Sequence, residues 1–161
     1  MKVLVLEDQG TASNYLIKYI SEKAGHEPVL ARSIKDGESI LEESLGEEYL
    51  KIDCIIADIN MPADGLKPEE KKISELGKFA GWLWLSRHVF VREEFEYLSL
   101  RTIIYSIYVD DLRNSELGVE LKGILQVHKQ PARGGIRKLH RCLDEIAKQV
   151  ARSKSYAPKE G

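Results

Sequence analysis

The sequence lacks the features that mark several special classes of protein. Only two of its 161 residues are cysteines, which excludes a disulfide scaffold, and both lie in apolar segments that predict a reduced core. The longest apolar stretches, residues 3–6 and 82–85, are far shorter than the ~18 residues that a membrane span needs. Acidic Glu7 and Asp8 follow the first stretch directly, so a signal peptide is not expected.

A charge excess of either sign is also absent. The 24 Lys and Arg residues face 26 Asp and Glu residues, which gives a formal net charge of −2. This balance provides no general attraction to nucleic acid or to an anionic membrane, so neither is expected as a direct partner. The composition, 43% hydrophobic and 31% charged, is typical of a folded globular protein. With the reduced thiols, it predicts a single cytoplasmic domain.

Short apolar runs alternate with amphipathic segments along the chain. Three runs are apolar on both faces, as in strands that helices cover on each side: residues 3–6, 54–57 and 102–105. Two weaker candidates are residues 28–31 and 124–127. Apolar residues recur at helical spacing between them, in residues 12–24, 34–45 and 136–150, and a short helix is expected within 110–123. Strands that alternate with helices predict a doubly wound α/β sheet.

Residues 63–80 interrupt this alternation. The segment is charged and helix-prone, with Glu69-Glu70-Lys71-Lys72 at its centre, and it has no sustained apolar stripe. We interpret it as an inserted surface segment that adds little to the core, and a gating or docking role stays open beside a purely solvated one. Residues 153–161 are polar and predict a C-terminal tail, which leaves residues 1–152 as the domain.

Polar residues stand at the carboxyl ends of four predicted strands, where open parallel sheets bind ligands. Glu7 and Asp8 follow the first strand, Asp58 the third, Ser106 the fourth and Lys129 the fifth. Three neighbouring carboxylates repel one another unless a cation lies between them, and oxygen ligands suit Mg²⁺. A carboxylate beside such a metal can act as a nucleophile, while a lysine and a hydroxyl hold phosphoryl oxygens. The set therefore predicts reversible phosphorylation of an aspartate.

These residues and their surroundings resemble the receiver domain of bacterial two-component response regulators. The resemblance covers residues 2–150 and depends on four segments: Val3-Leu4-Val5-Leu6-Glu7-Asp8, Ile55-Ile56-Ala57-Asp58-Ile59-Asn60-Met61-Pro62, Ile104-Tyr105-Ser106 and Val127-His128-Lys129-Gln130-Pro131. It implies a five-stranded, flavodoxin-like parallel sheet in a three-layer α/β/α arrangement.

The resemblance also implies a role for each polar residue. Asp58 is the implied phosphoacceptor. The implied Mg²⁺ ligands are Glu7, Asp8 and Asp58, with the backbone carbonyl of Asn60. Ser106 is the implied switch hydroxyl, and Lys129 is the implied phosphate-pairing lysine. A sensor histidine kinase or a histidine phosphotransfer protein is the implied phosphodonor. The implied domain is not an enzyme beyond promoting its own phosphoryl transfer and hydrolysis.

The sequence departs from the family's pattern around this site. Ile107 follows Ser106 where the family usually has a small residue, and Gln130 separates Lys129 from the next proline. Val127 takes the position of the family's aromatic switch residue. The interval from the phosphoacceptor to the switch hydroxyl is longer than usual, and residues 81–85 resemble the start of the family's third helix. The excess length therefore falls between residues 62 and 81.

Two functions stay open at this point. In the first, the chain is a stand-alone phosphoacceptor module that signals through a downstream protein, because nothing after residue 152 is expected to form an output domain. In the second, it is a degenerate receiver that acts as an interaction scaffold, with Ile107, Gln130 and the 63–80 segment preventing phosphorylation. A phosphatase of the haloacid dehalogenase type is weaker, because Asn60 stands where those enzymes need an acid. A homodimer through the last helix also stays open.

Overall fold

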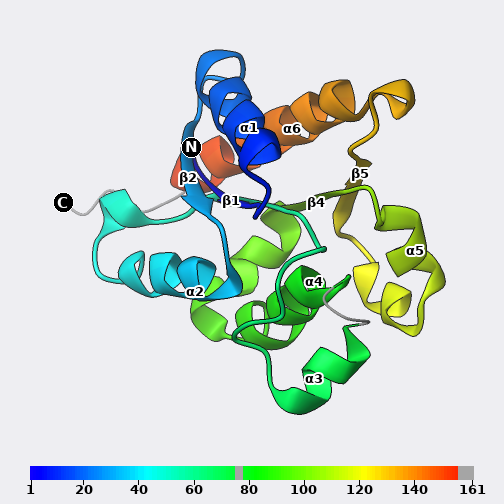
Figure 1. Ribbon diagram of the computed structural model, residues 1–161. Helices are drawn as coiled ribbons and strands as arrows, with labels where there is room; N and C mark the ends of the chain where they lie inside the picture. The colour runs from blue at the N-terminus through cyan, green and yellow to red at the C-terminus, as the bar shows by residue number, and fades with distance from the viewer. Residues whose placement is uncertain (75–77, 156–161) are drawn as a thin grey trace.

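A single sheet of five parallel strands forms the centre of the molecule, seen in a computed structural model that describes residues 1–74 and 78–155 (Figure 1). The strands are β1 (Lys2–Leu6), β2 (Glu27–Ala31), β3 (Cys54–Ala57), β4 (Thr102–Ser106) and β5 (Leu125–His128). Their spatial order, β2-β1-β3-β4-β5, is that of a flavodoxin-like doubly wound sheet. The predicted fold class is confirmed, and both weaker runs are strands.

The central strands are mostly apolar because helices cover both faces of the sheet. Every residue of β3 and β4 is buried. Successive side chains of a strand point to opposite faces, so Leu4 and Leu6 join one core cluster while Val3 and Val5 join the other. The two clusters are the two helix–sheet interfaces of a three-layer α/β/α structure.

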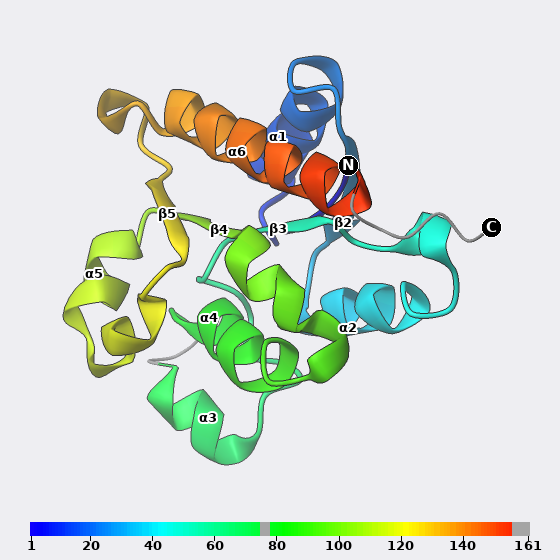
Figure 2. The same ribbon diagram turned by 180° about the vertical axis from the view of Figure 1, so that it is seen from behind.

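The helices divide between these two faces (Figures 1 and 2). One face carries α1 (Gly10–Glu22) and α6 (Gly135–Ser155), and the other carries α2 (Ile34–Glu43), α4 (Ala80–Trp84) and α5 (Val109–Asn114), with α3 (Pro68–Ile73) beyond α4. A π-helical segment (Leu85–Val89) continues α4, and 3₁₀ segments span Glu48–Leu50, Glu93–Arg101, Glu116–Leu121 and Pro131–Arg133. Among the described helices, none is long and apolar enough to cross a membrane.

The helix predictions agree with the structure to within a few residues at each end. The Ser33 side chain accepts a hydrogen bond from the Asp36 N–H (3.1 Å), which caps α2 at its start. Leu139, Leu143 and Ile146 of the apolar stripe of the last helix are fully buried against the sheet, and Ile136 at its start is partly buried. This helix continues three residues beyond the expected domain end at residue 152, to Ser155. Residues 156–161 of the predicted tail lie outside the described residues.

Residues 63–80 contribute more to the core than the sequence suggested. Three charged residues of α3, Glu69, Lys71 and Lys72, are exposed as expected, but Glu70 is buried at 5% exposed. However, Leu66 and Phe79 are only 6% and 2% exposed, and both belong to the core cluster shared with α2 and α4. The expectation that the segment adds little to the core is therefore wrong. Leu66 and Phe79 are too far apart in the sequence to form an apolar stripe, because they lie on either side of the charged helix α3. Residues 75–77 lie outside the described residues.

Candidate functional site

The strand register brings the predicted site residues to one edge of the sheet. Leu6 pairs with Ala57 in the neighbouring strand, so the next residues, Glu7 and Asp58, leave the sheet at the same level. The Asp58 N–H donates to the carbonyl oxygen of Leu6 (2.9 Å), which continues the ladder by one residue. Ser106, at the end of β4, pairs with the last residue of β5, and Lys129 follows directly.

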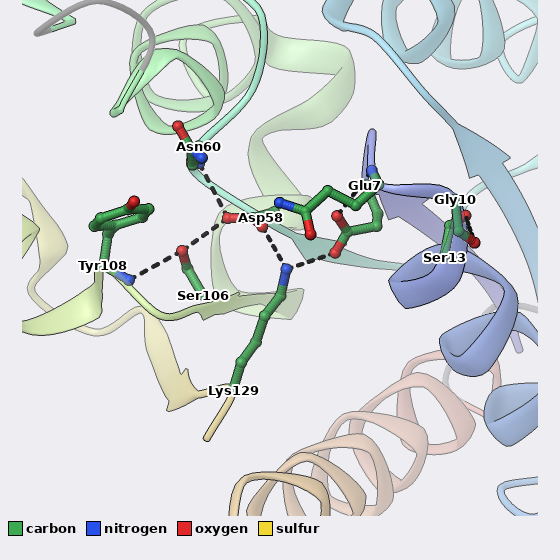
Figure 3. A network of polar contacts seen from close by, with 9 residues as sticks. Glu7, Gly10, Ser13, Asp58, Asn60, Ser106, Tyr108 and Lys129 are labelled. Carbon is green, nitrogen blue, oxygen red and sulfur yellow. Dashed lines mark hydrogen bonds and ion pairs between the residues drawn. The ribbon is translucent and has the colours of Figure 1, made fainter. Parts of the chain in front are cut away.

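The Asp58 carboxylate is the centre of a buried polar network (Figure 3). Its Oδ1 accepts hydrogen bonds from the Ser106 hydroxyl (2.7 Å) and from the Asn60 N–H (3.0 Å), while its Oδ2 pairs with the Lys129 ammonium. The same ammonium donates to Glu7 Oε2 at 2.5 Å. Glu7 and Asp58 expose only 1% and 5% of their side chains, so one cation serves two buried carboxylates.

Burial and charge shift the pKa values in this network. Burial alone would lower the pKa of Lys129, but the nearby carboxylates of Asp58 and Glu7 outweigh it and raise that pKa. The pKa of Glu7 is also raised, because the loss of solvent and the charge of Asp58 outweigh the contacts with Lys129. Lys129 additionally lies 5.8 Å from the ring centroid of Tyr105, whose pKa is raised to about 12 mainly by burial.

Asp8 stands apart from this network. Its Oδ1 is buried and has no hydrogen-bond partner among the described residues. In the described part of the chain, no three His, Cys, Asp or Glu side chains group closely enough to hold a metal ion. Glu7 and Asp58 do lie close together, and the Lys129 ammonium between them compensates their negative charges (Figure 3).

The chemistry of the residues nevertheless suits Mg²⁺. Their donors are oxygen atoms, which this ion prefers, and a buried carboxylate oxygen without a partner is one that a cation would satisfy. We therefore retain Glu7, Asp8, Asp58 and the carbonyl of Asn60 as candidate ligands, and their metal-binding role stays a prediction.

Two glycines that the sequence analysis did not assign to the site allow helices to pack closely against its backbone. The Gly81 N–H, in α4, donates to the carbonyl oxygen of Ile59 at 3.0 Å, and a Cβ atom at Gly81 would collide with the carbonyl oxygen of Asp58. A Cβ atom at Gly135 would likewise collide with the backbone next to Lys129. Only glycine permits both helices to approach so closely, and a tertiary contact of this kind leaves no local pattern in the sequence.

The three departures from the receiver pattern have clear places in the structure. Ile107 is 49% exposed, and Gln130 is exposed at the start of a 3₁₀ turn. Val127 is buried on the α1 and α6 side of the sheet, within the core cluster of Leu139 and Leu143. A buried valine has no ring that could swing between a buried and an exposed position.

Comparisons with known proteins add a fold assignment. No family model and no curated protein sequence matches the chain. The solved structures that are similar to it include the following three. A response regulator receiver domain protein from Clostridium thermocellum has 23% identity and a TM-score of 0.55, covering 97% of this chain and 98% of that one. A sensor protein from Polaromonas sp. JS666 has 16% identity and a TM-score of 0.58, covering 90% and 97%.

The third similar structure is an adenylate cyclase from Rhodopirellula baltica, with 14% identity, a TM-score of 0.53 and coverage of 98% and 97%. In each case the similarity extends over nearly the whole of both chains, so the 63–80 region does not prevent an overall match. These identities are low, and they establish the architecture rather than a shared activity. The chain therefore has the fold of a response regulator receiver domain.

Proposed function

We propose that this protein is a phosphoacceptor module of a two-component phosphorelay, in which Asp58 takes up the phosphoryl group. The observation that carries the proposal is the Asp58 carboxylate itself, held at the carboxyl edge of the sheet between the Ser106 hydroxyl and the Lys129 ammonium. A hydroxyl and an ammonium on either side of a carboxylate are suited to bind the oxygens of a phosphoryl group placed on it.

The reaction requires one bond to form and one to break. An oxygen of Asp58 attacks the phosphorus atom of a phosphohistidine, the P–N bond breaks, and its electron pair returns to the imidazole of the donor. Ser106 and Lys129 then turn from the carboxylate to the phosphoryl oxygens. A bound Mg²⁺, held by Glu7, Asp8, Asp58 and the carbonyl of Asn60, would supply positive charge beside the phosphoryl group.

The partners follow from this chemistry. The donor is a sensor histidine kinase or a histidine phosphotransfer protein, and the phosphorylated state is read by a downstream protein. The net charge of −2 favours neither nucleic acid nor an anionic membrane as a direct partner. Free thiols at Cys54 and Cys142 agree with a cytoplasmic location. A homodimer through α6 stays a prediction.

One observation favours the degenerate scaffold as a second candidate. The Lys129 ammonium bridges Glu7 and Asp58, and the described residues contain no ready-made group of metal ligands. A chain that had lost its metal would keep such an ion pair for structural reasons alone. The two candidates therefore differ in whether Mg²⁺ can enter and whether Asp58 can be phosphorylated.

Intact-mass analysis after incubation with acetyl phosphate and Mg²⁺ separates the two functions. We expect the mass of one phosphoryl group to be added to the wild type and not to Asp58→Asn. Asp64→Asn is a matched control, because Asp64 is an exposed aspartate of the following loop. Beryllofluoride with Mg²⁺ should bind the wild type only, and Asp8→Ala should abolish any rise in Tm caused by Mg²⁺. A wild type without added mass and without beryllofluoride binding would identify a scaffold.

A further inference from the structure

Lys78, at the end of the 63–80 segment, reaches across to the element that follows the switch hydroxyl. Its ammonium lies 2.7 Å from Asp111 Oδ2 in α5 and 5.4 Å from the ring centroid of Tyr108, the residue just before α5. The ring of Phe79 also lies close to it, at 5.3 Å. A cation is thus held between two rings and a carboxylate, which fixes it to the loop between β4 and α5.

The residues after Lys78 are fixed to the opposite loop. Phe79 is buried in the core, and the Gly81 N–H donates to the carbonyl oxygen of Ile59, one residue after Asp58. Gly81 also lies too close to the carbonyl oxygen of Asp58 to allow a Cβ atom. Residues 78–81, which we call the clasp, therefore contact the loop after β4 at one end and the loop after β3 at the other.

The two loops also meet at the candidate site itself. The Tyr108 N–H donates to Ser106 Oγ (3.2 Å), and the Ser106 hydroxyl donates to Asp58 Oδ1 (2.7 Å), as Figure 3 shows. A closed ring of contacts thus leads from Asp58 through Ser106 and Tyr108 to Lys78, and back through Gly81 to the backbone of Asp58. The clasp forms the part of this ring of contacts that does not itself touch the Asp58 carboxylate.

Resting on the proposed function, we propose that Lys78 is a positioning residue for phosphoryl transfer. It holds the Tyr108 loop against the clasp, and this keeps the Ser106 hydroxyl at hydrogen-bonding distance from Asp58. Ile107 and Tyr108 follow Ser106 directly in the chain, so a shift of their backbone moves the hydroxyl with it. The 63–80 segment then contributes to the geometry of the reacting site through the clasp.

The size of the effect has an upper limit. A contact can shift the population of a competent arrangement only by its own differential free energy. The Lys78 and Asp111 side chains are 31% and 51% exposed, and partly exposed ion pairs and cation–π contacts are individually weak. Loss of both contacts should lower the competent population by up to about five-fold, in line with these weak energies.

The test compares charge-removing and charge-keeping variants in the full chain. Lys78→Met removes the ammonium and keeps the aliphatic stem, whereas Lys78→Arg keeps the charge and the stacking on the rings. Lys72→Met is the matched control, because Lys72 is an exposed lysine of α3. The readouts are the initial rate of mass gain from acetyl phosphate with Mg²⁺, the Kd for beryllofluoride, and the urea midpoint as a measure of folding.

We expect Lys78→Met to lower the rate and weaken beryllofluoride binding, up to about five-fold, with a smaller effect on the urea midpoint. Lys78→Arg should restore both, and Lys72→Met should match the wild type. Asp111→Asn should give no further loss in combination with Lys78→Met, since the two residues act through one contact. Equal rates in Lys78→Met and the wild type, or equal losses in Lys78→Met and Lys78→Arg, would overturn the inference. A wild type that gains no mass would refute the proposed function, and the inference with it.

Discussion

Replacing Lys129 by methionine is the most direct test of the charge arrangement at the site. Methionine keeps much of the length of the lysine stem and removes the ammonium that pairs with both Glu7 and Asp58. The change therefore leaves two carboxylates side by side in a buried position with no cation between them. The structure predicts a large loss of folding stability from this single change.

The magnitude follows from burial. The Lys129, Glu7 and Asp58 side chains are 16%, 1% and 5% exposed. The two ion pairs that they form are therefore buried ion pairs and not weak surface ion pairs. Removing one partner of a buried ion pair costs about 3–5 kcal/mol, because the remaining charge is uncompensated. For a domain of this size, each kcal/mol lowers Tm by about 2–4 °C, which gives a fall of roughly 6–20 °C.

The assay is urea unfolding in the presence of EDTA, with the midpoint compared at equal slope. Lys154→Met is the control, since Lys154 is 64% exposed and 3.5 Å from Asp53, and its loss should leave the midpoint essentially unchanged. The deficit of Lys129→Met should shrink as the pH falls. A carboxyl whose folded pKa is raised, as that of Glu7 is, destabilises the fold above that pKa and ceases to do so below its unfolded value of 4.5.

The reasoning would be refuted by a Lys129→Met protein whose unfolding free energy at neutral pH lies within about 0.5 kcal/mol of the wild type, the range of ordinary surface changes. A deficit that grows as the pH falls would equally contradict it, because protonation must relieve the repulsion between the two carboxylates.

Two further predictions concern the 63–80 segment. Phe79→Ala should cost about 3–5 kcal/mol in urea unfolding, as expected for a buried aromatic residue, whereas Ile73→Ala, at 42% exposed, should change stability by no more than about 0.5 kcal/mol. Burial alone would raise the pKa of Glu70, but the Lys67 N–H and the His88 ring outweigh it and lower that pKa. The stability that Glu70 provides is therefore present above pH 4.5 and is lost as the pH falls through the lowered pKa. The Tm difference between the wild type and Glu70→Gln should disappear there.

The sheet was predictable because its physics is local in sequence. Strands covered on both faces carry apolar residues on both of them, and runs of this kind mark most of β1, β3 and β4 without reference to any partner. The strand ends also followed, since parallel strands present their carboxyl ends at one edge. The proximity of Glu7, Asp58, Ser106 and Lys129 is a consequence of that topology.

The interior of residues 63–80 was not predictable in the same way. Leu66 and Phe79 are single buried positions separated by a charged helix, and a lone apolar residue has the same appearance in a core and in a loop. The role of Gly81 depends on a backbone more than twenty residues away in the chain, at Asp58 and Ile59, and is invisible to any local pattern. Information about long-range backbone contacts is absent from short sequence windows.

The charge count at the site links the structure to the predicted metal dependence. Without a phosphoryl group, one ammonium compensates two carboxylates, Glu7 and Asp58, while Asp8 keeps a buried oxygen without a partner. Phosphorylation removes the charge of Asp58 and adds roughly two negative charges on the phosphoryl oxygens. The single Lys129 ammonium would then have to compensate Glu7 and the phosphoryl group, while Asp8 adds a further negative charge at the same edge of the sheet. A divalent cation beside Asp8 would balance that excess, so we predict that phosphorylation of Asp58 and metal binding at Asp8 favour each other.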